Sequence, residues 1–282
     1  MQTNSATLEK DSIQQPELWK LALAIGSDRI DVGLYPPLAR EEIMWRSFTF
    51  DPTAPTPLRA VEDIIYDNPL LFSDFKRVDC IINNVAAIPL PKSISVETAY
   101  NIYTQATACG EESISENEIE FFDAGVDNAQ IALIQQRDIR AFLLRTFYNA
   151  RFDSAIASFC RYFAQKADAP KGPAIYAPIN GNRLTLIALD GRRLLMANEF
   201  KFEKEIDAVY YILAVTKQLE LDPTNTPVFV SPGMPDEPEA LLTILAQYMP
   251  LTEPIPFPTL RYRASKSTLQ APLSLTIRPL CE

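Results

Sequence analysis

The feature that most constrains the fold is a block of strand, turn, strand, third strand and amphipathic helix that occurs twice in the sequence. In the first copy, residues 19–25 form a nearly continuous apolar run, Gly26-Ser27-Asp28 is a turn signal, and residues 30–35 alternate between apolar and other side chains. A third strand follows at residues 45–50, and a proline cluster separates it from a helix whose apolar stripe begins at Leu58. This copy therefore predicts a hairpin with a buried first strand, a third strand and a helix.

The second copy has clearer turn signals and begins after the breaking segment 169–173. Asn180-Gly181-Asn182 and Asp190-Gly191 are the turns that tight hairpins require, and they separate three apolar strands. The next helix begins near Glu205 and places Ile206, Val209, Tyr210 and Leu213 on one face. A three-stranded meander followed by a helix is therefore predicted in both halves of the chain.

Other elements connect and extend the two copies. Apolar patterns predict strands at residues 78–85, 131–134 and 227–231, and helices that begin near Ser95, Ile139 and Ile156 and after a cap at Asp236. After Pro250 the chain is rich in proline, and we expect residues 273–277 to form at most one late strand at a sheet edge.

Length, charge and hydropathy limit the class of protein. A chain of 282 residues with 47% apolar content can bury a substantial core. The net charge of −10 disfavours nucleic acid and anionic membranes as partners, because a phosphate backbone is bound by clustered Lys and Arg. Residues 1–16 are polar, and no uncharged apolar run reaches the roughly 20 residues of a membrane span. We therefore expect a soluble, cytoplasmic protein without a membrane span.

The chain contains no histidine, which excludes several kinds of site. Ser-His-Asp and Cys-His catalysis and histidine-ligated zinc all need an imidazole. The four cysteines, Cys80, Cys109, Cys160 and Cys281, are far apart in sequence and form no C-x-x-C pair. We therefore expect buried, reduced thiols, and neither a zinc ribbon nor a redox dithiol.

Clusters of charge are predicted to lie on the surface. The acidic segment 111–123 lacks the ligand spacing and the turn glycine of a calcium-binding loop, so we expect a solvated acidic face there and no metal. Arginines between residues 137 and 161 alternate with an apolar stripe, which favours an outer helix surface over an anion site. The aromatic pairs at 121–122 and 210–211 are interpreted as core.

The order of elements over nearly the whole chain resembles the actin-like, or ribonuclease-H-like, ATPase fold. Ala24-Ile25-Gly26-Ser27-Asp28 and Ile179-Asn180-Gly181-Asn182 are the turns that carry this resemblance. More closely, the chain is similar to an uncharacterised bacterial family of this length whose members look like actin-like folds without assigned function. A doubly wound parallel sheet is the main alternative, but the meanders and the absence of a Gly-rich first βα turn argue against a dinucleotide fold.

The resemblance implies an α/β protein of two lobes, each a mixed sheet with flanking helices. After a polar tail at residues 1–16, residues 17–168 would form the first lobe. Residues 169–282 would form the second lobe, with a proline-rich C-terminal segment.

The resemblance also implies a nucleotide site whose key residues are missing here. In active members of the superfamily, each lobe has an Asp-x-Gly hairpin that wraps the phosphates and organises Mg²⁺, and a Gly-Gly loop seats the adenosine. Aligned on Gly26 and Gly181, this chain has Ala24 and Ile179 where those aspartates belong. In the loop 230–233, a proline without a backbone N–H replaces one glycine. Asp31-Val32-Gly33 spells Asp-x-Gly, but it falls within the second strand, and we interpret it as a coincidence.

A nucleotide could still bind through the backbone amides of tight turns. The candidate residues are Ser27, Asp28, Asn180, Gly181, Ser231 and Gly233. ATP with Mg²⁺ would be the cofactor, although we favour both hairpins as core-forming turns without one. No catalytic residue and no metal ligand is predicted, and hydrolysis should be very slow because phosphoryl transfer depends on Mg²⁺ and its carboxylate ligands.

Two functions remain open. The favoured one is a catalytically silent actin-like module that binds another protein or itself, similar to the actin-like platform proteins of bacterial assembly machines. The alternative is a divergent nucleotide-binding ATPase or phosphotransferase in which Asp28 or Asp190 supplies a carboxylate near the interlobe cleft. The sequence leans away from an enzyme.

Overall fold

The computed structural model describes residues 7–38, 41–83, 86–107, 118–166, 169–231, 238–258, 262–263 and 265–281. The chain forms two compact units, which we describe separately. Unit 1 consists of Met1–Val85, Ile134–Ala155 and Pro258–Arg278, and unit 2 of Ala86–Leu133, Ile156–Phe257 and Pro279–Glu282. These ranges differ from lobes at 17–168 and 169–282, because residues 86–133 and 156–168 join unit 2 and residues 258–278 join unit 1.

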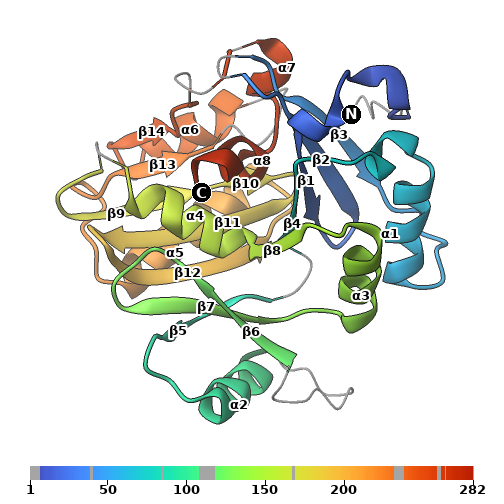
Figure 1. Ribbon diagram of the computed structural model, residues 1–282. Coiled ribbons are helices and arrows are strands. Elements are labelled where there is room, and N and C mark those ends of the chain that lie inside the picture. Colours follow the sequence, from blue (N-terminus) through green and yellow to red (C-terminus); the bar gives the residue numbers. More distant parts are fainter. Residues whose placement is uncertain are drawn as a thin grey trace. The chain divides into compact units, whose positions relative to one another are not determined.

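Unit 1 is built on a five-stranded mixed sheet with the order β3-β2-β1-β4-β8 (Figure 1). Its antiparallel meander, β1 to β3, is the one that the turn signal predicts, and β4 and β8 extend β1 in parallel. The strands are β1 (Lys20–Ile25), β2 (Arg29–Tyr35), β3 (Met44–Thr49), β4 (Arg77–Ile82) and β8 (Ala150–Ser154).

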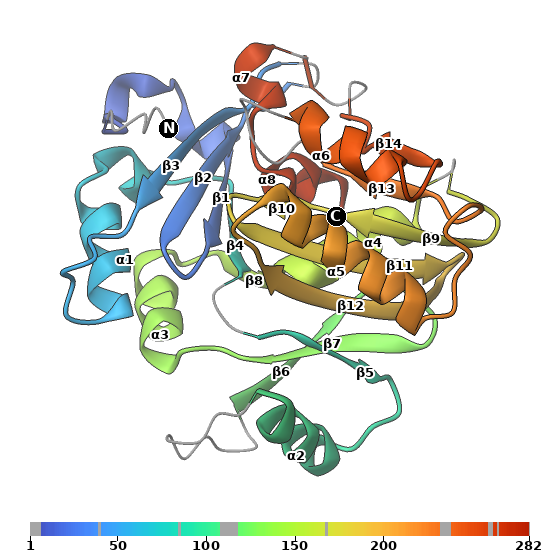
Figure 2. The ribbon, with the colours of Figure 1, turned by 180° about the vertical axis from the view of Figure 1, so that it is seen from behind.

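Helices cover the apolar face of this sheet. Leu21, Leu23 and Ile25 of β1 are fully buried on that face. There α1 (Pro57–Tyr66) and α3 (Arg137–Thr146) lie side by side, and η3 (Pro69–Phe72) follows α1 (Figures 1 and 2). Thr56 caps α1 by accepting a hydrogen bond from the Arg59 N–H, and Pro57 occupies its first turn, as helix-start chemistry requires.

The expectation of a late strand at residues 273–277 is wrong. These residues form the helix α8 (Leu273–Ile277), and it packs against β1 and β2 of unit 1. The apolar side chains at 273, 275 and 277 imitate the two-residue period of a strand, but burial against the sheet decides the local conformation. The short helix α7 (Lys266–Leu269) precedes α8, and η5 (Arg278–Leu280) follows it.

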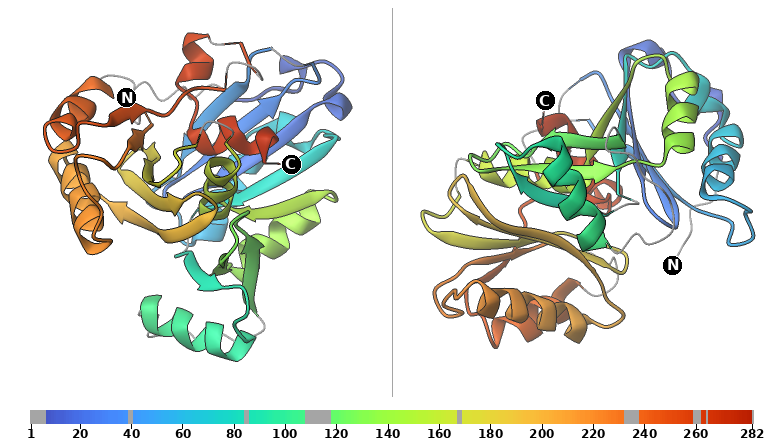
Figure 3. Two further views of the ribbon diagram at one scale, coloured as in Figure 1. Left: turned by 90° about the vertical axis from the view of Figure 1, so that its left-hand side faces the viewer. Right: turned by 90° about the horizontal axis from the view of Figure 1, so that it is seen from below.

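The main sheet of unit 2 lies between two helical layers. Its order is β10-β11-β9-β13-β14, with β12 also paired to β11. On one face, α5 (Glu205–Gln218) and α6 (Pro238–Ala246) cover a core that includes Ile175, Leu186 and Ile212 (Figure 2; Figure 3, right). On the other face, α4 (Ala155–Ala164) stacks Phe163 on Tyr176 with ring centroids 4.2 Å apart. The strands are β9 (Pro173–Ala177), β10 (Ile179–Asn180), β11 (Arg183–Asp190), β12 (Arg193–Lys201), β13 (Val228–Val230) and β14 (Thr252–Pro254).

A small second sheet completes unit 2. It has the order β5-β7-β6, with α2 (Val96–Thr107) beside it (Figure 3, left). The Asn128 side chain joins this sheet to β12, because it donates to the Leu194 carbonyl and accepts from the Leu194 N–H, both at 2.9 Å. The strands are β5 (Ile88–Pro91), β6 (Ile119–Asp123) and β7 (Ala129–Ile134), and η1 (Lys10–Ser12) and η2 (Pro16–Leu18) precede β1 in unit 1.

None of the helices in the ranges given above has the length and apolar character that a membrane-spanning helix requires.

Candidate functional site

The first predicted turn is a closed hairpin whose acidic group is already paired. The Gly26 N–H donates to the Arg29 carbonyl at 2.9 Å, so Ser27 and Asp28 form a two-residue loop. The Asp28 carboxylate accepts from Arg29 Nε at 3.3 Å and Nη2 at 3.1 Å. This hydrogen bonding raises the pKa of Arg29, against the opposing effect of burial. The charge of Asp28 is therefore balanced within the hairpin.

The second predicted turn is held by a buried serine. Gly181 adopts a left-handed φ of 60°, which lets the chain turn back between Asn180 and Arg183. Ser231 Oγ accepts from the Ile179 N–H at 2.7 Å, and the Ser231 N–H donates to the Ala177 carbonyl. The structure thus brings Ser231 beside the residue preceding Asn180, and the hydroxyl binds the backbone there. Gly233 lies outside the described residues.

Sequence reasoning missed a row of residues on the second face of the unit 1 sheet. Asp31 lies directly across from Ala24, Ala24 is next to Ile81, and Ile81 is next to Asp153. Asp79 lies two residues before Ile81 on β4, so its side chain points to the same side. All three aspartates are at most 5% exposed. We call this surface, defined by Asp31, Asp79 and Asp153, the carboxylate face.

Arginine side chains neutralise two of these buried carboxylates. Arg278 Nη2 donates to Asp79 Oδ1 at 3.0 Å, and Nη1 of the same guanidinium donates to Asp153 Oδ2. Arg77 donates to Asp79 Oδ2 through Nε at 2.9 Å and Nη2 at 2.7 Å. Burial opposes the charge on Arg278, but the hydrogen bonds and the attraction of the two carboxylates outweigh it and raise its pKa. The guanidinium therefore supplies positive charge between two carboxylates, where a bound metal ion could otherwise do so.

The C-terminal segment, residues 265–278, holds Arg278 over the carboxylate face. The indole Nε1 of Trp45 donates to the Ser267 carbonyl at 2.8 Å, and the Tyr35 hydroxyl donates to the Leu275 carbonyl at 2.8 Å. Burial raises the pKa of Tyr35 well above 10.0, which keeps this donor protonated. A Cβ at Gly33 would lie 3.3 Å from the Leu275 side chain, so the glycine allows close approach.

One signal for this face was present in the sequence. Asp31 and Asp79 interrupt apolar strand runs, and buried carboxylates need a paired cation. The partner could not be identified from sequence, because Arg278 is 199 residues from Asp79. Among the described residues, no group of three or more Cys, Asp or Glu side chains is placed to hold a metal ion.

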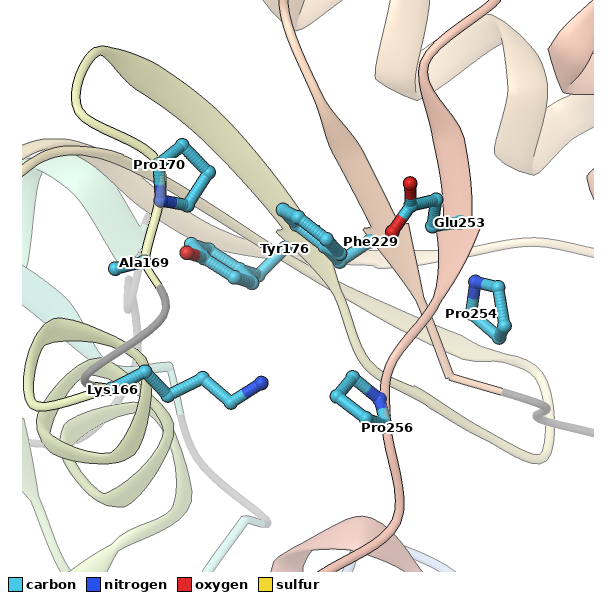
Figure 4. A pocket seen from close by; sticks show the side chains of 8 residues that line it. All are labelled: Lys166, Ala169, Pro170, Tyr176, Phe229, Glu253, Pro254 and Pro256. Carbon is cyan, nitrogen blue, oxygen red and sulfur yellow. The ribbon is translucent and has the colours of Figure 1, made fainter.

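Unit 2 contains an open pocket of about 310 Å³ (Figure 4). Tyr176 and Phe229 stack at 5.2 Å on neighbouring strands, and Glu253 follows on β14 in the same cross-strand row. Lys166 extends toward the pocket from the opposite side (Figure 4). The remaining lining residues are Ala169, Pro170, Pro254 and Pro256. Proline has no N–H donor, so this lining suits an apolar or aromatic group between opposite charges better than a polyphosphate.

Two of the described cysteines fit the expectation of buried thiols. Cys80 and Cys160 are buried and free, and burial raises the pKa of each to about 12. They are therefore protonated near neutral pH and are poor nucleophiles. Cys281 is partly exposed, and Cys109 lies outside the described residues.

Solved structures confirm the fold expected from the sequence. A protein of Bacteroides thetaiotaomicron with an actin-like ATPase fold and unknown function is 19% identical, with a TM-score of 0.70 over 86% of this chain and 92% of that one. The PilM-PilN type IV pilus biogenesis complex contains a chain that is 13% identical, with a TM-score of 0.52 over 93% of this chain and 97% of that one. At such identities the likeness shows the fold, which is the actin-like ATPase fold.

Sequence comparison gives a narrower classification of the chain than the fold does. No curated protein matches it significantly. The model of one protein family, described as "Protein of unknown function (DUF3822)", matches residues 8–251. This protein therefore belongs to the DUF3822 family.

Proposed function

We propose that this protein is a catalytically silent actin-like module that binds protein surfaces as part of an assembly. The observation that carries the proposal is Arg278 on the carboxylate face, where it contacts Asp79 and Asp153. A buried guanidinium held by two carboxylates satisfies their charge from within the chain. A divalent cation at these two aspartates would have to displace the guanidinium.

The residues at both hairpins fit magnesium and nucleotide poorly. Ala24 and Ile179 offer no oxygen ligand, the Asp28 carboxylate is paired with Arg29, and the Ser231 hydroxyl accepts from the backbone. Mg²⁺ requires near-octahedral oxygen ligands, and phosphoryl transfer depends on charge neutralisation by that ion. We therefore derive no hydrolytic step for this chain.

Two observations support a binding role. The pocket of unit 2 presents stacked aromatic rings and prolines flanked by Lys166 and Glu253, a composition suited to an apolar side chain of a protein partner. In addition, a structurally similar chain comes from the PilM-PilN type IV pilus biogenesis complex. By analogy of fold, this protein would act through a partner of its own.

A thermal-shift titration with ATP, ADP and GTP, each with and without Mg²⁺, tests the proposed lack of nucleotide binding and hydrolysis. A ligand at 100 times its Kd stabilises the folded state by about 2.7 kcal/mol, which shifts the melting temperature by several degrees. We expect no saturable shift at millimolar nucleotide and no Mg²⁺-dependent phosphate release. A saturable rise with Mg²⁺ would instead support the nucleotide-binding ATPase or phosphotransferase.

The binding half is tested by affinity purification of the tagged chain from its own cells. A protein retained in stoichiometric amount by the native chain, and lost with Glu253→Lys in the pocket, would support it. The matched control is Glu220→Lys, an exposed charge reversal in unit 2 that is not part of the pocket lining. Equal retention by both variants would place binding elsewhere, and no stoichiometric partner of any kind would contradict the proposal.

A further inference from the structure

Unit 1 exposes a group of aromatic rings at the ends of α1 and α3. Tyr66 and Phe72 stack at 5.8 Å although they are 54% and 45% exposed, and Phe142 meets the Tyr66 ring edge-on at 5.9 Å. Arg145 follows Phe142 by three residues on α3 and therefore lies on the same side of that helix. By the name aromatic patch we mean the exposed residues Tyr66, Phe72, Arg145 and Tyr148 at the ends of these neighbouring helices.

Tyr148 is the most exposed large side chain of this patch, at 83%. The backbone around it is nevertheless held in place, because the Asn149 side chain donates to the Phe75 carbonyl at 2.8 Å, just after η3. A tyrosine on a fixed backbone loses less conformational freedom when it is covered than one on an unsupported loop. Tyr and Arg on a fixed backbone are the residue types that dominate binding energy at protein interfaces.

Unit 2 exposes a second apolar surface on α5. Val209, Ile212 and Val215 of this helix face the core. The expectation that Ile206 and Tyr210 share that buried face is wrong, because they are 51% and 66% exposed on the outer side of the helix. These two residues are four apart and therefore neighbours on the helix. A helix that is apolar on its outer side as well has a surface suited to a partner. We name Ile206, Tyr210 and the exposed Glu203, which precedes the helix, the α5 face. Figure 2 shows the helix α5 itself on the outer layer of unit 2.

Charge is divided unequally between the two units. Unit 1 has 16 Lys and Arg against 15 Asp and Glu, a net +1, whereas unit 2 has 10 against 21, a net −11. The patch of unit 1 includes Arg145, and Arg137 is also exposed on α3, while α5 begins with the acidic residues Glu205 and Asp207. Contact between two copies of unit 2 would be repulsive, and contact between unit 1 and unit 2 would not.

We propose that the partner for these surfaces is a second copy of this chain, with the α5 face of one copy on the aromatic patch of the next. The inference rests on the proposed protein-binding function and identifies one partner for it. Because the two surfaces differ, the contact is head-to-tail, and each copy keeps one of each surface available. The local attraction between the exposed arginines of α3 and the acidic start of α5 acts over short range, since the Debye length is about 10 Å at 0.1 M salt.

Sedimentation velocity on the full chain over a hundredfold concentration range tests this proposal. We expect the average sedimentation coefficient to rise with concentration at about 0.1 M salt. Tyr148→Glu places a charge in the patch and Tyr210→Glu places one in the α5 face, so each variant alone should associate about tenfold or more weakly. Both side chains are mostly exposed, so circular dichroism should show both variants folded.

Mixing the two variants separates head-to-tail contact from other arrangements. Tyr148→Glu keeps an intact α5 face and Tyr210→Glu keeps an intact patch, so an equimolar mixture should form a dimer that grows no further. Tyr248→Glu, at an exposed tyrosine of unit 2 beyond α5, is the matched control and should associate like the native chain. A native chain that stays monomeric throughout, or a mixture that fails to dimerise, overturns the inference. Neither result affects the proposed lack of hydrolysis or binding to a different protein.

Discussion

The Arg278→Ala substitution removes the guanidinium that lies between Asp79 and Asp153. The three side chains are 10%, 1% and 7% exposed, so water cannot replace the lost charge without opening the structure. Breaking a buried ion pair by removing one partner costs about 3–5 kcal/mol. Arg77 still contacts Asp79, so Asp153 is the carboxylate that mainly loses its positive partner. We therefore expect the free energy of unfolding to fall by about 3 kcal/mol, the lower end of that range. This is a large part of the roughly 5–15 kcal/mol that stabilises a folded protein.

Urea unfolding followed by tryptophan fluorescence measures this loss, because Trp45 lies against the C-terminal segment. The matched control is Arg263→Ala, whose ion pair with Glu42 is formed by side chains that are 72% and 36% exposed. An exposed pair contributes little to stability, so this variant should unfold nearly like the native chain.

Two further variants test the physical cause of the loss. Arg278→Lys keeps the charge but has no planar fork to span both carboxylates, so its stability should be intermediate. Arg278→Met combined with Asp153→Asn removes both charges and should recover part of the loss. If Arg278→Ala were no more destabilising than Arg263→Ala, the carboxylate face would not depend on an internal cation, and the observation that carries the proposed function would be lost.

Three other substitutions or conditions give sharp expectations. Because the pKa of Cys80 and of Cys160 is about 12 when folded, the stability they contribute is complete below the ordinary thiol pKa of 9.0 and is lost as pH rises toward 12. Urea unfolding at pH 10 should therefore show a loss of up to about 1.4 kcal/mol per thiol, absent in the alanine variants. Ser231→Ala leaves a buried N–H without its acceptor and should cost about 1–3 kcal/mol in the same assay. Gly125→Ala, with a φ of 65° and a Cβ 2.7 Å from a neighbouring arginine side chain, should lower the melting temperature, whereas Gly172→Ala, with no atom within 4 Å, should leave it unchanged.

The meanders were predictable from sequence because their signals are local. The apolar run 19–25 became β1, Lys20–Ile25, and the Asp-Gly turn at 190–191 joins β11 to β12 as its chemistry requires. Pairing inside a hairpin depends on turn residues and alternation within about ten positions, all of which the sequence displays.

Two strands, β8 and β6, were not predicted. The segment Ala150–Ser154 contains Arg151 and Asp153 and lies between two helices, so its pattern resembles a connection. It becomes β8 because it pairs with β4, about 70 residues earlier, and because Arg278 neutralises Asp153. Likewise β6, Ile119–Asp123, was interpreted as part of an acidic surface, although its place beside β7 makes it a strand.

Asp31 lies within β2 and not at the turn of the hairpin. The structure places Asp31 across from Ala24, the position where active relatives of this fold would have a carboxylate. Directly opposed like charges on neighbouring strands destabilise a sheet, and Cβ atoms there are only about 4.5–5.5 Å apart. An acid at position 24 would face Asp31 on a side of the sheet already buried under the C-terminal segment. Both Ala24 and Arg278 therefore limit the negative charge on this buried face. Ala24 adds no carboxylate beside Asp31, and Arg278 neutralises Asp79 and Asp153.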